Sequence, residues 1–119
     1  MSFGAEHRLA TYGSLAPGRV NHHRLRSLRG TWTEGTVRGH FIRQGWGASI
    51  GFPAMRPAAN GQVIAVHILE SADLPATWPV LDEFEGTDYV RVEVLATLDD
   101  GSERPCFIYA LSTEANTEA

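Results

Sequence analysis

The sequence contains no lysine and a single cysteine, Cys106. All ten basic side chains are arginine, and we attribute this bias to codon usage in preference to selection for bidentate anion contacts. A lone thiol cannot form a disulfide within the chain, so the simplest expected location is the cytoplasm. Because Cys106 stands beside Phe107 and Ile108, it is expected to be a buried strand thiol and not a nucleophile.

Further features of the sequence argue against several classes of protein. No apolar run approaches the roughly 20 residues that a membrane-spanning helix needs. The first ten residues include Glu6, His7 and Arg8 where a secretory signal has a continuous apolar segment, so neither a membrane nor export is expected. The formal net charge of −4 argues against a nucleic-acid partner. No acidic or cysteine partner stands at metal spacing from His22 and His23, so no metal and no cofactor is expected.

The length of 119 residues predicts one domain, 1–119, with a polar tail from about residue 112. Five segments rich in β-forming residues predict strands: Arg8–Tyr12, Thr31–Gln44, Gln62–Leu69, Tyr89–Leu98 and Arg104–Leu111. Asp99-Asp100-Gly101 predicts a hairpin turn between the last two strands. The Gly- and Pro-rich segment Gly45–Pro57 is predicted to be loop.

Two short helices are predicted. The first lies in His22–Leu28 and is stopped by Gly30. An apolar stripe at helical spacing marks the second: Leu74, Trp78, Leu81 and Phe84. Because Pro79 is not expected deep inside a helix, this helix is predicted to follow a turn near Pro75, to begin at Thr77 or Trp78, and to end at Gly86.

Helices and strands do not alternate regularly, which argues against a doubly wound parallel sheet. The pattern predicts an α+β fold, mostly β, in the form of a small mixed β-barrel with two short helices. The sequence carries no indication of the oligomeric state.

The first candidate constellation is the end of the first predicted strand, Tyr12-Gly13-Ser14-Leu15. A strand that runs into Gly-Ser exposes successive backbone N–H groups, which form a nest suited to a carboxylate or a phosphate. Strand exits of this kind are more often plain turns. This one is neither a P-loop nor a nucleophile elbow, because no Gly-Lys-Ser/Thr follows and Ser14 lacks the Gly-x-Ser-x-Gly frame.

The second constellation is the acidic end of the second predicted helix. Asp82, Glu83 and Glu85 crowd its last turn, where the helix macrodipole disfavours negative charge. Asp82 and Glu85 are three residues apart and share a face. Mutual repulsion, the helix end and burial beside Phe84 would raise the pKa of a carboxylate toward the range that a general base needs. A solvated acidic helix end is the plainer interpretation of the same residues.

Taken together, the two constellations resemble the two signatures of the gamma-glutamylcyclotransferase and gamma-glutamylamine cyclotransferase (AIG2-like) families. Segment 12–15, followed by Gly18, is similar to their Tyr-Gly-Ser/Thr-Leu loop. Segment 81–86, followed by Tyr89 and Arg91, is similar to their Leu-Asp-x-Phe/Tyr-Glu-Gly motif. The likeness runs from about Leu9 to Leu111, and Tyr109 lies near a late-strand tyrosine. One departure is segment 65–68, Ala-Val-His-Ile, where the families' central strand carries Gly-Glu-x-Tyr.

The resemblance implies a barrel with a small cavity and assigns roles to single residues. The catalytic carboxylate of these families is the glutamate before the motif glycine, which corresponds to Glu85. The loop amides of Gly13, Ser14 and Leu15 would hold the α-carboxylate of the substrate. Two aromatic residues, Tyr12 and Tyr89, are expected to complete the substrate site.

The implied activity is the release of 5-oxoproline from a gamma-glutamyl amine or peptide by intramolecular aminolysis, with Glu85 as general acid and base. The expected partner is a small-molecule gamma-glutamyl substrate. Two alternatives stay open at this point: an enzyme that acts on a related acyl or carbamoyl nitrogen compound, and a small-molecule binding module that kept the cavity without turnover.

Overall fold

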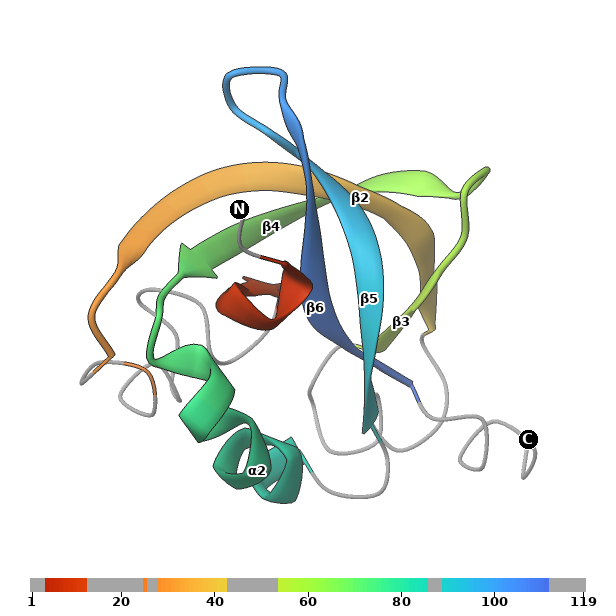
Figure 1. Cartoon of the computed structure of the whole chain (residues 1–119). Helices are drawn as coiled ribbons and strands as arrows, with labels where there is room; N and C mark the ends of the chain where they lie inside the picture. Colours follow the sequence, from red (N-terminus) through yellow and green to blue (C-terminus); the bar gives the residue numbers. More distant parts are fainter. Residues whose placement is uncertain (1–3, 13–24, 26–27, 43–53, 86–88, 112–119) are drawn as a thin grey trace.

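The computed structural model describes residues 4–12, 25, 28–42, 54–85 and 89–111 (Figure 1). Six strands form one sheet: β1 (Arg8–Thr11), β2 (Thr31–Ile42), β3 (Ala54–Pro57), β4 (Gln62–Glu70), β5 (Tyr89–Leu98) and β6 (Glu103–Leu111). One turn of 3-10 helix, η1 (Ala5–His7), precedes β1, and one α-helix, α2 (Leu74–Glu85), joins β4 to β5. The predicted helix at 22–28 lies almost entirely outside the described residues.

The sheet closes on itself. The strand order is β3-β2-β4-β1-β6-β5, and an additional pairing of β2 with β5 joins the ring β2-β4-β1-β6-β5 into a five-stranded barrel. The strand β3 extends β2 outside this ring. Strands β1 and β6 are parallel and the other pairs are antiparallel, so the predicted mixed β-barrel is confirmed.

Gly35 is required where the barrel closes. It pairs with Leu98 of β5 and also with Val66 of β4, so neighbouring strands approach it on both sides. A Cβ atom at this position would lie 2.6 Å from the carbonyl oxygen of Thr97 and 2.9 Å from the side chain of Ile68. The first of these contacts involves backbone, which cannot move aside without opening the ladder.

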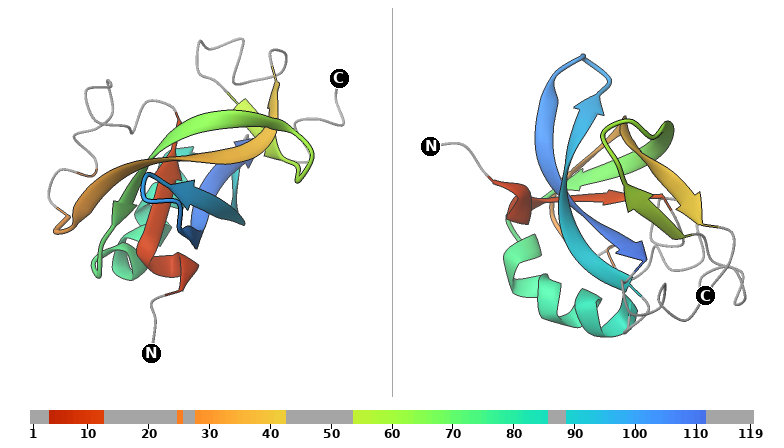
Figure 2. Two further views of the ribbon diagram at one scale, coloured as in Figure 1. Left: turned by 90° about the horizontal axis from the view of Figure 1, so that it is seen from above. Right: turned by 90° about the vertical axis from the view of Figure 1, so that its right-hand side faces the viewer.

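Two apolar clusters lie on opposite sides of the barrel wall. The inner cluster contains alternate residues of the strands, including Ala10, Ile68 and Ile108. Their sequence neighbours Leu9, Leu69 and Tyr109 belong to the outer cluster, which α2 covers. This alternation is the period-two pattern of strands with both faces covered. Figure 2 shows α2 along one side of the barrel.

The helix α2 contributes its predicted stripe to the outer cluster. Leu74, Trp78 and Leu81 are buried, and the indole N–H of Trp78 donates a 2.9 Å hydrogen bond to the carbonyl oxygen of Glu6. No helix in the described part of the chain has the length and apolarity needed to span a bilayer.

The predicted start of this helix was wrong. It begins at Leu74, so that Pro75 lies in the first turn and Pro79 in the interior. The first turn tolerates Pro75, because its N–H would have no acceptor within the helix. Pro79 removes one bond, the bond to the Pro75 carbonyl, and both prolines lie on the exposed face. The burial of Trp78 and Leu81 on the opposite face offsets this loss.

The predicted loop Gly45–Pro57 was also partly wrong, because its last four residues form β3. Met55 of this strand is fully buried in the inner cluster and pairs with Phe41 of β2. Pro57 is tolerated because β3 is short and pairs on one side only. The other predicted strands and the turn at Gly101, which has a φ of 86°, are confirmed to within one or two residues over their described parts.

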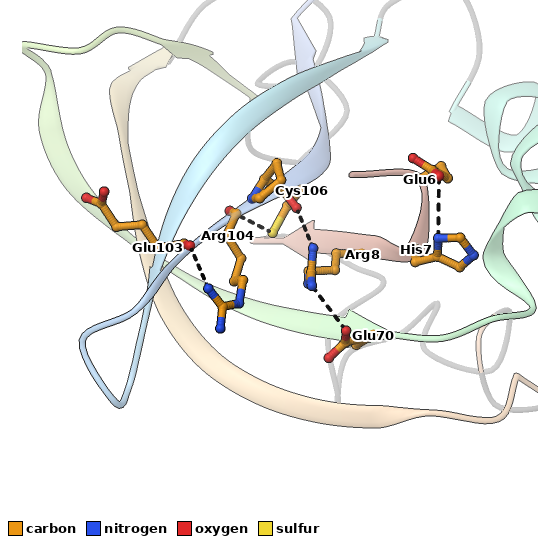
Figure 3. A network of polar contacts seen from close by, with 8 residues as sticks. Glu6, His7, Arg8, Glu70, Glu103, Arg104 and Cys106 are labelled. Carbon is orange, nitrogen blue, oxygen red and sulfur yellow. Dashed lines mark hydrogen bonds and ion pairs between the residues drawn. The ribbon is translucent and has the colours of Figure 1, made fainter. Parts of the chain in front are cut away.

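A buried arginine ties three strands together at the end of the barrel away from the α2 C-terminus (Figure 3). Arg8 of β1 lies 3.2 Å from the carboxylate of Glu70 on β4 and donates a 3.3 Å bond to the carbonyl oxygen of Pro105 on β6. Its side chain is only 8% exposed, so the paired carboxylate and carbonyl compensate the burial of its charge.

Candidate active site

Strand directions bring the end of β1 and the start of β5 to one rim of the barrel. Because β1 and β6 are parallel, with Ala10 opposite Ile108, both strands end at the same rim. β5 begins there, since Tyr89 pairs with Leu111 at the end of β6. The chain therefore enters the predicted anion-binding loop and leaves α2 on the same side of the molecule. The loop residues themselves, 13–15, lie outside the described residues.

Position 85 is the last residue of α2. It follows Leu81 by four residues and Trp78 by seven, so helical spacing places it on the face that packs against the barrel. Four peptide units separate it from Tyr89, so the two Cα atoms are at most about 14 Å apart. The backbone of Glu85 is therefore at the rim, and its side chain lies outside the described part of the chain.

Tyr12 anchors the point where the chain leaves β1. Its ring packs against the inner cluster, and its hydroxyl donates a 2.7 Å hydrogen bond to the carbonyl oxygen of Tyr109. This bond connects the residue before the predicted loop to β6. Tyr89, the other aromatic residue predicted for the site, is half-buried and packs against the outer cluster. Its contact with a substrate stays a prediction.

The strongest polar cluster at this rim centres on Asp82, one turn before Glu85. The carboxylate of Asp82 accepts bonds from Nε and Nη2 of Arg91, at 2.9 and 3.1 Å, and a 2.6 Å bond from the hydroxyl of Tyr109. The bonds from Arg91 are the largest influence on Asp82 and lower its pKa. Burial opposes them with the next largest effect, and the bond from Tyr109 and the positive charge of Arg91 lower the pKa further. Asp82 is therefore a weak base near neutral pH.

Sequence reasoning quoted Arg91 and Tyr109 as parts of motifs but gave neither a role. Both residues lie on the outer face of the barrel, directly opposite each other across the β5–β6 ladder, and the end of α2 lies above them. The Tyr-x-Arg spacing after the acidic motif was the available signal. It could not identify Asp82 as the partner, because that depends on how the helix packs on the strands.

The surroundings of Cys106 exclude it as a nucleophile, whereas His22 and His23 lie outside the described residues. Cys106 is fully buried, and burial raises the pKa of its thiol to about 11, so it stays protonated and is not a nucleophile. Within the described residues, no group of three or more His, Cys, Asp or Glu side chains could hold a metal ion.

Comparisons with known proteins agree with this architecture. A family model described as gamma-glutamyl cyclotransferase, AIG2-like, matches residues 9–119. A search of curated proteins gives no match. Among solved structures, an AIG2-like protein from Mus musculus is 18% identical, over 92% of this chain and 81% of that chain, with a TM-score of 0.66.

Two further proteins share the fold. A protein from Arabidopsis thaliana is 19% identical, over 95% of this chain and 64% of that chain, with a TM-score of 0.70. The allophanate hydrolase of Kluyveromyces lactis is 13% identical, over 92% of this chain and 18% of that chain, with a TM-score of 0.61. At these identities the likeness shows the fold alone, and it confirms the predicted barrel.

Proposed function

The chain belongs to the gamma-glutamyl cyclotransferase, AIG2-like family, and on that basis we propose that it converts a gamma-glutamyl amine or peptide to 5-oxoproline and a free amine. The α-amine of the substrate attacks its own γ-carbonyl carbon. A new C–N bond closes the five-membered lactam, and the C–N bond to the leaving amine breaks. The reaction needs no co-reactant, and a small gamma-glutamyl molecule is the only partner it requires. The cytoplasm is the proposed location.

Glu85 is the proposed proton carrier. At neutral pH an α-amine is mostly ammonium and is not nucleophilic, so a base must remove a proton before or during attack. The carboxylate of Glu85 takes this proton and returns it to the departing nitrogen. Such general acid–base catalysis contributes about 10²–10⁴ in rate.

The observation that supports the proposal is that the end of β1 and the end of α2 lie at the same rim of the barrel. The exit of β1 and the end of α2 are separated by some seventy residues in sequence, yet the strand directions bring both to one end of the barrel. Asp82, the neighbouring carboxylate on the helix, is held ionised by Arg91 and Tyr109. By helical spacing from Trp78 and Leu81, position 85 belongs to the barrel-facing side of the last turn.

The loop amides of Gly13, Ser14 and Leu15 are proposed to hold the α-carboxylate of the substrate. This assignment is supported by Tyr12, the residue just before the loop, which is held in place by its hydrogen bond to β6. Holding a flexible gamma-glutamyl chain in a curled form brings the reacting atoms together. Well-oriented intramolecular reactions gain about 7–11 kcal/mol in this way.

The wall formed by β4 departs from the family pattern. Val66 and Ile68 are buried in the inner cluster, so this part of the interior offers no hydrogen-bonding side chain. On this proposal the loop amides and Glu85 bind polar groups of the substrate that β4 does not bind. This favours a substrate with an apolar leaving amine.

The test is an assay for 5-oxoproline with a panel of gamma-glutamyl dipeptides and gamma-glutamylamines. The wild-type protein is expected to form it, and Glu85→Gln to lose about 10²–10⁴ of the rate without a change in melting temperature. Glu83→Gln is the matched control, because Glu83 lies in the same turn and is exposed. A fully active Glu85→Gln protein would contradict the role of Glu85.

A different result would support another function. If acidic metabolites raise the melting temperature but none is consumed, the chain is a binding module with the same fold. Turnover of an acyl or carbamoyl nitrogen compound without lactam formation would identify the other alternative, an enzyme that acts on a related substrate.

A further inference from the structure

The polar cluster around Asp82 is more elaborate than a surface ion pair. Arg91 donates two bonds to the two carboxylate oxygens of Asp82, and Tyr109 donates a third. Bidentate, charge-assisted bonds of this kind fix the relative orientation of the two groups as well as their distance. The cluster therefore connects the last turn of α2 to both β5 and β6.

Aromatic rings hold the arginine in place. The guanidinium carbon of Arg91 lies 4.6 Å from the ring centroid of Trp78 and 4.8 Å from that of Phe107. The two rings meet edge to face at 5.4 Å. A planar guanidinium can stack on such rings and still donate two parallel bonds, which a lysine ammonium cannot do. The side chain of Arg91 is only 26% exposed.

The cluster also sets the charge around position 85. Asp82 is three residues before Glu85, and both stand at a helix end that already disfavours negative charge. The other charged or titratable residues on the described elements that pack against α2 are Glu6 and His7 of η1, Arg8 of β1, Tyr89, Arg91 and Glu93 of β5, and Glu103, Arg104, Cys106 and Tyr109 of β6. Glu103, Arg104 and Cys106 lie toward the end of the β5–β6 ladder opposite Tyr89. Arg8 pairs with Glu70, and Glu6 and His7 lie beside Trp78, two turns before Glu85. Arg91 is thus the cation nearest to the last turn among these residues.

We propose that Arg91 is a positioning residue for Glu85: it fixes the last turn of α2 against the barrel and neutralises the carboxylate that precedes Glu85 by one turn. The inference rests on the proposed function, since it assigns Arg91 a part in the same site. The bond to Asp82 raises the pKa of Arg91, and the reciprocal lowering at Asp82 is consistent with a pair that stays ionised.

The decisive experiment compares the pH dependence of kcat/KM in three variants. Arg91→Gln leaves the Asp82 charge unpaired, which favours the protonated form of Glu85, so the acidic limb of the profile should move to higher pH. Asp82→Asn leaves the Arg91 charge unpaired, which favours the ionised form, so the limb should move to lower pH. Shifts of about half a pH unit are expected at this separation. The double variant removes both charges and should return the limb close to its wild-type position.

Loss of position is measured separately from loss of charge. Arg91→Lys keeps the charge but not the bidentate geometry, so its acidic limb should stay close to that of the wild type while kcat falls. Arg91→Gln should lose about 10²-fold in kcat with little change in KM, because misplacement by about 1 Å can cost that much. Arg104→Gln is the matched control, since Arg104 is exposed at the far end of β6 and should change neither quantity.

The inference would be overturned if the acidic limb of the kcat/KM profile moved in the same direction in Arg91→Gln and Asp82→Asn, or moved in neither. A titration of the ¹³C-labelled Glu85 carboxyl group, assigned with Glu85→Gln, measures the same opposite shifts without any turnover. If the wild-type protein forms no 5-oxoproline, the proposed function fails, and this titration still decides whether Arg91 and Asp82 act on Glu85. Melting temperatures identify any variant that has not folded.

Discussion

At the residue scale, Asp82 and Glu83 are neighbouring carboxylates in the last turn of α2 that differ in their surroundings. Asp82 is bound by Arg91 and Tyr109 and stays ionised, whereas Glu83 is exposed. Position 85 comes one turn after the last buried residue of α2, at the rim of the barrel. Asp82 and Glu83 both carry a carboxylate, so the difference between them arises from the contacts that Asp82 makes with β5 and β6.

The pairing of Asp82 predicts a pH-dependent contribution to stability. Because its pKa is lowered in the folded protein, its contribution is present above the unfolded pKa of about 3.9 and is lost as the pH falls through the folded value. Asp82→Asn should therefore lower the free energy of unfolding at pH 7. The side chain is 44% exposed and solvent screens the pair, so the expected loss is about 0.5–1 kcal/mol.

Urea unfolding of the wild type and Asp82→Asn at several pH values measures this effect. The difference should shrink as the pH falls below about 4 and should nearly vanish once Asp82 is protonated in both states. A difference that stays constant from pH 7 to pH 2.5 would mean that lost packing, and not lost charge, causes the destabilisation.

The candidate site could be predicted from the sequence only in part. The acidic motif and the Tyr-x-Arg spacing were visible, and they identified Glu85, Tyr89 and Arg91 as a group. The bond from Arg91 to Asp82 could not be predicted, because it depends on the ladder that places Arg91 opposite Tyr109 and on the packing of α2 above them. Neither is encoded in local spacing.

At the scale of elements, the errors share a cause, which is that long-range packing overrides local propensity. Pro79 locally disfavours a helix, yet α2 continues through it because Trp78 and Leu81 are buried on the opposite face. The segment β3 has only four residues and ends in a proline, so no alternation could be recognised. Its pairing with β2 and the burial of Met55 make it a strand.

Closure of the barrel depends on the small size of Gly35. Gly35→Ala should destabilise the protein by about 1–3 kcal/mol, because the new methyl group would overlap the backbone carbonyl of Thr97 in the neighbouring strand. Thermal unfolding measures the loss. Gly4→Ala is the control, since its new methyl group would meet only the flexible end of the Glu6 side chain. If Gly35→Ala has the same melting temperature as the wild type, β2 and β5 are not held as closely as this pairing requires.

At the scale of the whole molecule, one topological fact connects sequence to function. Because β1 and β6 are parallel, β1 ends at the rim where β5 begins. The helix α2 ends at Glu85, just before β5, so its C-terminus lies at the same rim (Figure 1). The β5–β6 turn lies at the opposite end. The family resemblance predicted the barrel, but the strand pattern alone did not predict which strands close it.

The most direct test of this account is an NMR titration of ¹⁵N-labelled Glu85→Gln protein with a gamma-glutamyl amine, since this variant should bind the substrate without consuming it. The backbone amides of Gly13, Ser14 and Leu15 and the amide of residue 85 are expected to shift together and to saturate with one common Kd. The α-glutamyl isomer, in which the amide and the free carboxylate are exchanged, is the matched probe and should bind more weakly. Shifts confined to one of the two segments, or absent from both, would contradict a shared site at this rim.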